Sequence, residues 1–186
     1  MRGRLTVSPG FWLLCALIWA VEPGLLLPTA LAAGCHELGH CAALRLLGNG
    51  PARLRLSALG AELTPKRTLS YANQLPAALA GPAVSLLCAF LAARWGFFLF
   101  AGLSLALGVF NLLPISPLDG GRALQSLCAL TLPAPLDRGV PKWLAVGTAG
   151  LVLGAAIGAF VRFAVLSLLV LALWLCYQSV KGLLEG

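Results

Sequence analysis

The sequence predicts an all-α, polytopic membrane protein with about six transmembrane helices, a three-helix core and a short β-hairpin after the second helix. The first observation behind this class is the composition: 60% of the 186 residues are hydrophobic and only 10% are charged, whereas a soluble domain averages about 25% charged residues. The second is that several apolar runs approach or exceed the ~20 residues needed to span a bilayer. We therefore expect residues 1–186 to form a single integral-membrane domain.

Prolines, glycines and charged residues divide the apolar sequence into six runs. Glu22-Pro23-Gly24 separates the first run from the second, and Gly48-Asn49-Gly50-Pro51 ends the second. Three prolines between residues 127 and 142 predict a loop there. The six predicted spans lie at about residues 8–22, 25–47, 71–95, 96–113, 143–160 and 163–180.

The first apolar run has a second interpretation, as a cleaved signal peptide. It follows a short basic start, and small residues occur near Ala30-Leu31-Ala32. Cleavage at that point would destroy the helix that contains His36, and the break at Glu22-Pro23-Gly24 is misplaced for a signal peptide. We therefore favour a short first span.

In the segment between the second and third spans, Ala52–Thr64, the spacing of apolar residues changes. Polar and apolar residues alternate from Arg53 to Ala58, and a period of two predicts a strand. Gly60 would turn the chain into a second short strand. This hairpin is either a plain surface feature or an exposed strand edge, at Arg53 to Leu56, that binds an extended peptide by backbone pairing.

Residues 36–40, His-Glu-Leu-Gly-His, carry the strongest chemical signal. His36 and His40 are the only histidines in the chain, and their spacing of four places both imidazoles on one helix face, where they can reach one metal ion. Glu37 projects beside that metal, where a carboxylate can take a proton from an activated water, as in zinc hydrolases. Ionisable residues in a spanning helix are costly to bury and are usually functional.

A second polar signal interrupts the fourth span at residues 111–122, Asn-Leu-Leu-Pro-Ile-Ser-Pro-Leu-Asp-Gly-Gly-Arg. Irregular backbone at membrane depth is tolerated only where protein or a water-filled cavity receives it. Asp119 lies in this stretch and would supply a third, negatively charged metal ligand. Arg122 either pairs with Asp119 or extends to the membrane surface.

Charge and cysteine content exclude other classes. The net charge of +7 does not indicate nucleic-acid binding, because the cations lie in short loops and form no basic domain. The six cysteines lie in apolar surroundings without a Cys-x-x-Cys pair, so we expect small buried hydrophobes rather than disulfides. Cys35 and Cys41 flank the motif, but each points about 100° away from the neighbouring histidine, so we do not expect them to be ligands.

The loop charges predict the orientation of the chain. With six spans, one side of the membrane receives eleven cations and the other receives only Arg94 and Arg162. The positive-inside rule then places both termini in the cytoplasm, and His36, His40 and Asp119 all fall near the cytoplasmic ends of their spans, at one depth. The eleven are Arg2, Arg4, Arg45, Arg53, Arg55, Lys66, Arg67, Arg122, Arg138, Lys142 and Lys181.

Together these motifs resemble the site-2 protease family of intramembrane zinc metalloproteases. The resemblance rests on His-Glu-Leu-Gly-His at 36–40 and on Asn-Leu-Leu-Pro-Ile-Ser-Pro-Leu-Asp-Gly at 111–120, which matches the family's N-x-x-P-x-x-x-L-D-G motif. Gly81-Pro82 matches the start of the family's G-P-x-x-N motif, although Ser85 replaces its asparagine. The six-helix layout looks like the branch that includes stage IV sporulation protein FB.

The resemblance implies a catalytic core at about residues 25–125, with accessory helices at about 8–22 and 143–181. It implies one Zn²⁺ per chain, held by His36, His40 and Asp119, with Glu37 as the general base. Residues with a role in substrate positioning or behind the ligands would be Asn111, Ser85 and Arg122.

The implied activity is cleavage of membrane-tethered or transmembrane proteins near the cytoplasmic side, in a bacterial inner membrane. Regulated proteolysis in sporulation and an inhibitory membrane partner are further expectations from that branch, and nucleic acid is not an expected partner. Since Gly186 closely follows the last span, we expect neither a C-terminal regulatory domain nor a PDZ domain. The alternatives are a non-catalytic membrane binding or scaffold protein with a structural metal site, and a transporter, whose broken helices also carry polar residues.

Overall fold

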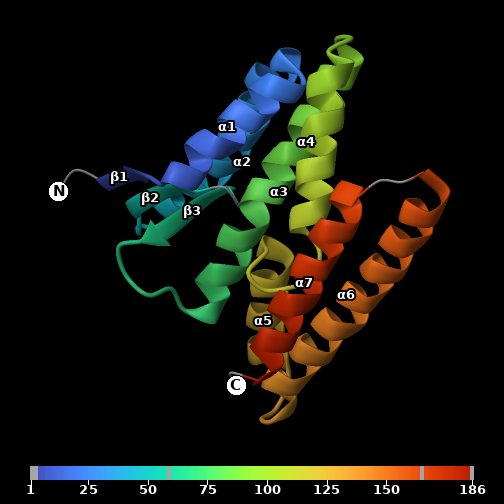
Figure 1. Ribbon diagram of the computed structural model, residues 1–186. Coiled ribbons are helices and arrows are strands. Elements are labelled where there is room, and N and C mark those ends of the chain that lie inside the picture. The colour runs from blue at the N-terminus through green and yellow to red at the C-terminus, as the bar shows by residue number, and fades with distance from the viewer. Residues whose placement is uncertain (1–3, 58–59, 164–165, 185–186) are drawn as a thin grey trace. The chain divides into compact units, whose positions relative to one another are not determined.

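The computed structural model describes residues 4–57, 60–163 and 166–184 (Figure 1). These residues form seven α-helices, one short 3-10 helix and three strands, which confirms the predicted, mainly helical class. The chain divides into two compact units, residues 1–110 and 111–186. Each unit is described by itself.

The first unit contains four apolar helices. These are α1 (Pro9–Val21), α2 (Leu26–Leu46), α3 (Tyr71–Arg94) and α4 (Phe98–Asn111), with the 3-10 helix η1 (Pro23–Leu25) between α1 and α2. Gly48 and Gly96 follow α2 and α3 with φ of 69° and 82°. This left-handed conformation ends a helix, and only glycine adopts it without steric cost.

A three-stranded sheet lies beside the helices of this unit. It comprises β1 (Arg4–Val7), β2 (Pro51–Ser57) and β3 (Gly60–Pro65), with β1 parallel and β3 antiparallel to β2. The antiparallel pair follows α2 as the sequence predicts, and residues 58–59 lie outside the described residues.

The predicted free strand edge at Arg53 to Leu56 is wrong. Strand β2 is the central strand, since Arg53 pairs with Arg4 on one side and with Thr64 on the other. Strand β1 was not predicted, because four residues with a basic start are too short to show a period of two. Backbone pairing of β2 is therefore satisfied within the chain, and it does not present an edge to a peptide.

Asn49 joins the end of α2 to the segment after the sheet. Its side-chain amide donates to the Arg67 carbonyl at 2.7 Å and its side-chain oxygen accepts from the Arg67 backbone N–H at 3.0 Å. Asn49 is only 8% exposed, so these two hydrogen bonds are shielded from water. They connect the two ends of the segment that contains β2 and β3. The strands are thereby held next to the C-terminal end of α2.

Helices α2 and α3 pack closely through small residues. A Cβ added at Gly39 of α2 would lie 2.6 Å from the Ala80 carbonyl oxygen of α3, so the two backbones can approach only because position 39 has no side chain. Helix α3 continues through Gly81-Pro82. At this dipeptide α3 also approaches α2 closely, as shown below for Gly81.

The second unit contains α5 (Asp119–Thr131), α6 (Leu136–Phe163) and α7 (Leu166–Leu184). The predicted loop at 127–142 is mostly wrong, since only residues 132–135 separate α5 from α6. The backbone N–H groups of Leu136 and Asp137 donate to the Pro133 carbonyl, and that of Gly139 donates to the Pro135 carbonyl. The prolines thus start the long helix α6 rather than prolong a loop.

Some helices in each unit have the composition of membrane segments. Among the described residues, three helices are long and apolar enough to span a bilayer: α3, α6 and α7. Helices α1 and α4 are also apolar but shorter, at 13 and 14 residues. The count of six spans therefore stays a prediction.

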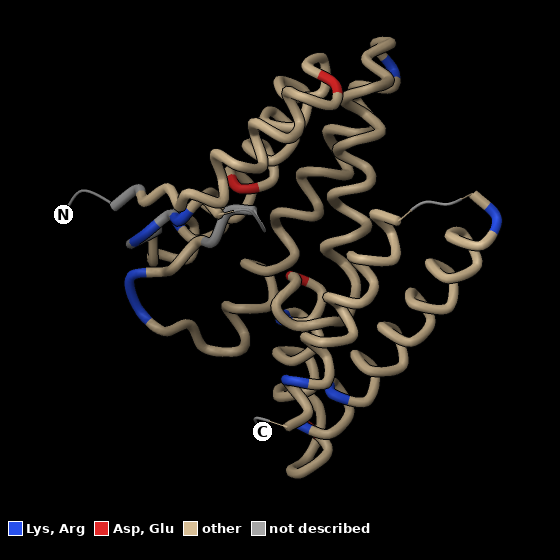
Figure 2. The backbone as a smooth tube through the Cα atoms, viewed as in Figure 1, with Lys and Arg blue, Asp and Glu red and all other residues tan. Residues whose placement is uncertain are grey.

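Charged residues are scarce along the helices of the first unit and gather at its sheet (Figure 2). Arg53 and Arg55 on β2 are exposed, as are Lys66 and Arg67 in the segment that follows β3. This clustering agrees with an apolar helical body whose polar end carries the loop cations.

Candidate metal centre

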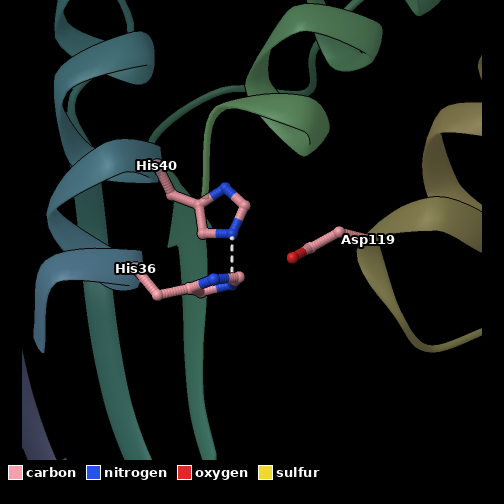
Figure 3. Close-up of side chains that lie close together, drawn as sticks. All are labelled: His36, His40 and Asp119. Atoms are coloured by element: carbon pink, nitrogen blue, oxygen red, sulfur yellow. Dashed lines mark hydrogen bonds between the residues drawn. The ribbon is translucent and has the colours of Figure 1, made fainter. Parts of the chain in front are cut away.

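His36 and His40 project from successive turns of α2, and their rings meet tip to tip. The Nε2 atoms of the two imidazoles lie 3.2 Å apart, and the ring planes are at 77° to one another (Figure 3). His36 is 4% exposed, while His40 is partly buried. The helical spacing of four thus produces the convergence that the sequence predicts.

Helix α3 holds each ring through its other nitrogen. His36 Nδ1 is hydrogen-bonded to Ser85 Oγ at 2.9 Å, and His40 Nδ1 donates to the Ala77 carbonyl at 2.8 Å. Both rings are therefore oriented by α3, with Nε2 directed toward the other histidine.

Gly81 provides the room for the His40 ring. A Cβ at position 81 would overlap His40 Nε2 and would lie only 2.6 Å from His40 Cε1. Because real Cβ atoms are not found at such distances, any other residue at 81 would displace the ring. Ala77, Gly81 and Ser85 are spaced by four, so one face of α3 serves both histidines.

The geometry of the histidine pair fits a metal ion. Two nitrogens bound at ~2.0–2.1 Å with a tetrahedral angle between them lie roughly 3.3 Å apart. The observed Nε2 separation is 3.2 Å. Metal-binding histidines also characteristically hydrogen-bond through their other nitrogen, as both rings do. The donor set and its spacing are thus those of a two-histidine metal site.

In the second unit, an irregular segment between α4 and α5 determines where Asp119 lies. Residues 112–118 fold back on the first turn of α5: a Cβ at Gly120 would lie 2.5 Å from the Leu113 carbonyl oxygen, and one at Gly121 would lie 2.5 Å from the Ile115 carbonyl carbon. The Asp-Gly-Gly sequence is therefore required for this contact. Asp119, the first residue of α5, is 8% exposed.

His36, His40 and Asp119 could each supply one ligand atom to a metal ion. Figure 3 labels these three side chains. A carboxylate with two imidazoles is a donor set typical of catalytic zinc. Cys35 and Cys41 are not part of this group. All six cysteines are free thiols, and only Cys128 is buried, whereas the sequence predicts that all six are buried.

The remaining predicted site residues differ in their surroundings. Glu37 is partly buried on α2, and Asn111 is partly buried as the last residue of α4. Arg122 is exposed, which agrees with a side chain that extends toward the membrane surface. Their catalytic roles stay predictions, whereas Ser85 directly contacts a histidine.

Sequence reasoning missed the Ala77 carbonyl as a partner of His40. Every residue has a carbonyl, so no sequence signal could have identified this one. The contact between Gly81 and the His40 ring was missed as well, because it depends on how α2 and α3 pack.

Comparisons with known proteins agree with this fold. Residues 92–155, about a third of the chain, match the sequence profile of Peptidase family M50; this stretch includes Asp119 but not the histidine motif. No curated protein matches the sequence detectably. The chain resembles the solved structure of the site-2 protease from Methanocaldococcus jannaschii with a TM-score of 0.67 and 18% sequence identity, covering 96% of this chain and 89% of that one.

The likeness at this level of identity establishes the fold: the chain has a site-2 protease fold. Among the described residues, three helices are apolar and long enough to span a bilayer, and His36 and His40 form a close pair.

Proposed function

We propose that this chain is an intramembrane zinc metalloendopeptidase. The observation that carries the proposal is the pair of Nε2 atoms 3.2 Å apart, each on an imidazole held by α3. A membrane helix has little reason to bury two imidazoles tip to tip unless they share a ligand. The M50 match over residues 92–155 supports the same class.

In this proposal His36 and His40 bind Zn²⁺ through Nε2, and Asp119 is the third ligand. Asp119 is a buried carboxylate at the first turn of α5, and such a group requires a cation or several hydrogen bonds to remain charged. The two neighbouring glycines allow residues 112–118 to pack on that turn, which would hold the carboxylate in a fixed orientation.

Bound zinc would lower the pKa of a water molecule and polarise a peptide carbonyl. Glu37 follows His36 by one residue, so its carboxylate projects about 100° around α2 from the ring of His36. From there Glu37 would take a proton from the attacking water and pass it to the leaving amine. Its partial burial would keep the carboxylate close to the reaction.

The substrates of such a site are transmembrane or membrane-tethered proteins. A helical substrate has its backbone hydrogen-bonded internally, so it must unwind before a peptide bond can be attacked, and unwinding in lipid is costly. We therefore expect residues of low helix propensity near the cut. We further propose cleavage near the cytoplasmic face of a bacterial inner membrane, with both termini cytoplasmic; a role in sporulation rests on the resemblance to stage IV sporulation protein FB.

The experiment that tests the proposal compares wild type with Glu37→Gln. Both proteins are purified in detergent, their zinc is measured by elemental analysis, and cleavage of a helix-destabilised membrane peptide is followed. We expect about one zinc per chain in both and a loss of cleavage of at least about 100-fold in Glu37→Gln, since general-base catalysis contributes 10²–10⁴-fold. Glu22→Gln, at an exposed position after α1, is the matched control and should cleave normally.

Retained cleavage by Glu37→Gln, in a preparation free of other proteases, would remove Glu37 from the mechanism. A wild-type protein that binds zinc but cleaves no membrane peptide would instead favour a non-catalytic protein with a structural metal site. A wild-type protein without zinc, under conditions that do not strip metal, would contradict the proposal itself.

A further inference from the structure

The sheet of the first unit is connected to the ends of three helices. Strand β1 leads directly into α1, where the backbone N–H of Ser8 donates to the Leu56 carbonyl of β2 at 2.8 Å. Strand β2 follows α2 after a short turn, and the segment after β3 leads into α3. Helix α1 also contacts β2, and α2 contacts both β2 and β3. With these helices in a membrane, the sheet lies at the boundary between lipid and water.

Alternation along β2 gives the sheet an exposed polar face. Arg53 and Arg55 are two residues apart, so their side chains project from the same face. In the backbone register, Arg53 is opposite Thr64 of β3 and Arg55 is opposite Thr6 of β1. All four of these residues are exposed, whereas Leu56, at the alternate position of β2, is half-buried.

This segment of the chain carries an excess of positive charge. Four cations and one carboxylate, that of Glu62, lie between Pro51 and Arg67, so the net charge of the segment is +3. Figure 2 shows the cations gathered at the sheet of the first unit. We call the four exposed cations the cationic sheet surface: Arg53, Arg55, Lys66 and Arg67.

The arrangement on β2 suits a phosphate group. Alternate residues of a strand are ~6.6–6.8 Å apart, so the long side chains of Arg53 and Arg55 can converge on one anion. A guanidinium group binds phosphate oxygens through two parallel N–H donors. The residues opposite them, Thr64 and Thr6, carry hydroxyl groups, which can donate further hydrogen bonds to the same oxygens.

We propose that the cationic sheet surface binds the headgroup phosphates of anionic phospholipids in the leaflet that it borders. Each Lys or Arg near an anionic membrane surface strengthens binding about fivefold, and the attraction falls off within a Debye length, ~8 Å at physiological salt. Cations connected to helix ends lie close enough for this attraction. The inference goes beyond the proposed function, because it depends on the membrane placement of the helices and not on zinc or on cleavage.

Lipid binding at this surface would fix the depth of α2 in the membrane. The backbone of Arg67 is hydrogen-bonded to Asn49, which closely follows the end of α2. His40 lies only six residues before Leu46, the last residue of that helix. A sheet bound to headgroups therefore keeps the histidine pair at a constant distance from the membrane surface.

The test counts the lipids that stay bound to the purified full chain in detergent, by native mass spectrometry. Phosphatidylglycerol and phosphatidylcholine with identical acyl chains are added in equal amounts, so that only the headgroups differ. We expect the wild type to retain phosphatidylglycerol preferentially. Combining Arg53→Gln with Arg55→Gln should lower that preference by about 5–25-fold, the contribution of one to two cations.

Two controls separate charge from folding. Arg94→Gln removes an exposed cation at the end of α3 that is remote from the sheet, and it should retain the wild-type preference. Combining Arg53→Lys with Arg55→Lys keeps both charges and should retain most of it. Raising the salt concentration from about 0.1 M to about 1 M shortens the Debye length from ~10 Å to ~3 Å, so the wild-type preference should fall.

The inference is overturned if the wild type shows no headgroup preference or if the double glutamine variant retains it in full. Equal loss in the double lysine variant would show that the sheet structure, and not its charge, determines lipid retention, and would also contradict the inference. If an acidic peptide but neither lipid binds at these arginines, the surface serves a protein partner instead. Neither zinc content nor cleavage enters these measurements, so their outcome is independent of the proposed function.

Discussion

The backbone of Gly81 on α3 lies directly against the ring of His40 on α2, so that a Cβ at position 81 would come within 2.6 Å of His40 Cε1. The same face of α3 bonds to His40 through Ala77 and to His36 through Ser85. The neighbouring helix α3 therefore positions both histidines. Gly81 leaves room for the His40 ring, the Ala77 carbonyl accepts from His40, and the Ser85 hydroxyl is hydrogen-bonded to His36. This relationship gives the first prediction.

Gly81→Ala should displace the His40 ring and weaken zinc binding by at least about tenfold, as loss of support behind a ligand does. Crowding at the α2–α3 contact should also lower the free energy of unfolding by ~1–3 kcal/mol. Zinc affinity and thermal unfolding in detergent check both effects. Gly102→Ala on α4, where a Cβ would meet nothing within 4 Å, is the matched control and should leave both unchanged or slightly raise stability.

Asp119→Ala should reduce the bound zinc from about one per chain to a small fraction, because two imidazoles alone hold zinc weakly. Elemental analysis after gel filtration measures this ratio. Asp137→Ala, which removes the carboxylate in the first turn of α6, is the control and should retain zinc. Normal zinc content in Asp119→Ala would refute its role as a ligand.

Gly121→Ala should destabilise the second unit by ~1–3 kcal/mol, since the added methyl would overlap the backbone of Ile115 and Ser116. Asp119 begins the same turn, so zinc retention should fall in parallel. Gly139→Ala, at an open position near the start of α6, should change the unfolding temperature little. An unchanged unfolding temperature in Gly121→Ala would show that residues 112–118 do not depend on this contact.

These variants complement Glu37→Gln. The changes at Gly81 and Asp119 should lower metal binding, whereas Glu37→Gln should lower cleavage alone. A variant set in which all three lose zinc equally would indicate general destabilisation rather than separate roles.

Elements with a strong local signal were predictable. The helices predicted at 25–47 and 71–95 are observed as α2 (Leu26–Leu46) and α3 (Tyr71–Arg94), because long apolar runs end at glycine or charged residues that terminate helices. Of these two, only α3 is long and apolar enough to be a candidate membrane span. The start of α6 was not predictable: Pro141 suggested a loop, but it lies inside α6, and the helix continues through it with the loss of only the backbone hydrogen bond to Asp137. Strand β1 was missed because its pairing with β2 is a long-range contact that four residues cannot reveal.

The sequence alone determined the membrane class and the candidate ligands, since hydropathy is a property of composition and the spacing of His36 and His40 is a property of one helix. Only the tertiary structure decided how the rings are held. Ser85 lies 49 residues from His36, and the Ala77 carbonyl lies 37 residues from His40. Such contacts depend on how α2 and α3 pack, which local periodicity does not encode, and a backbone carbonyl or a missing Cβ at Gly81 becomes functional only through that packing.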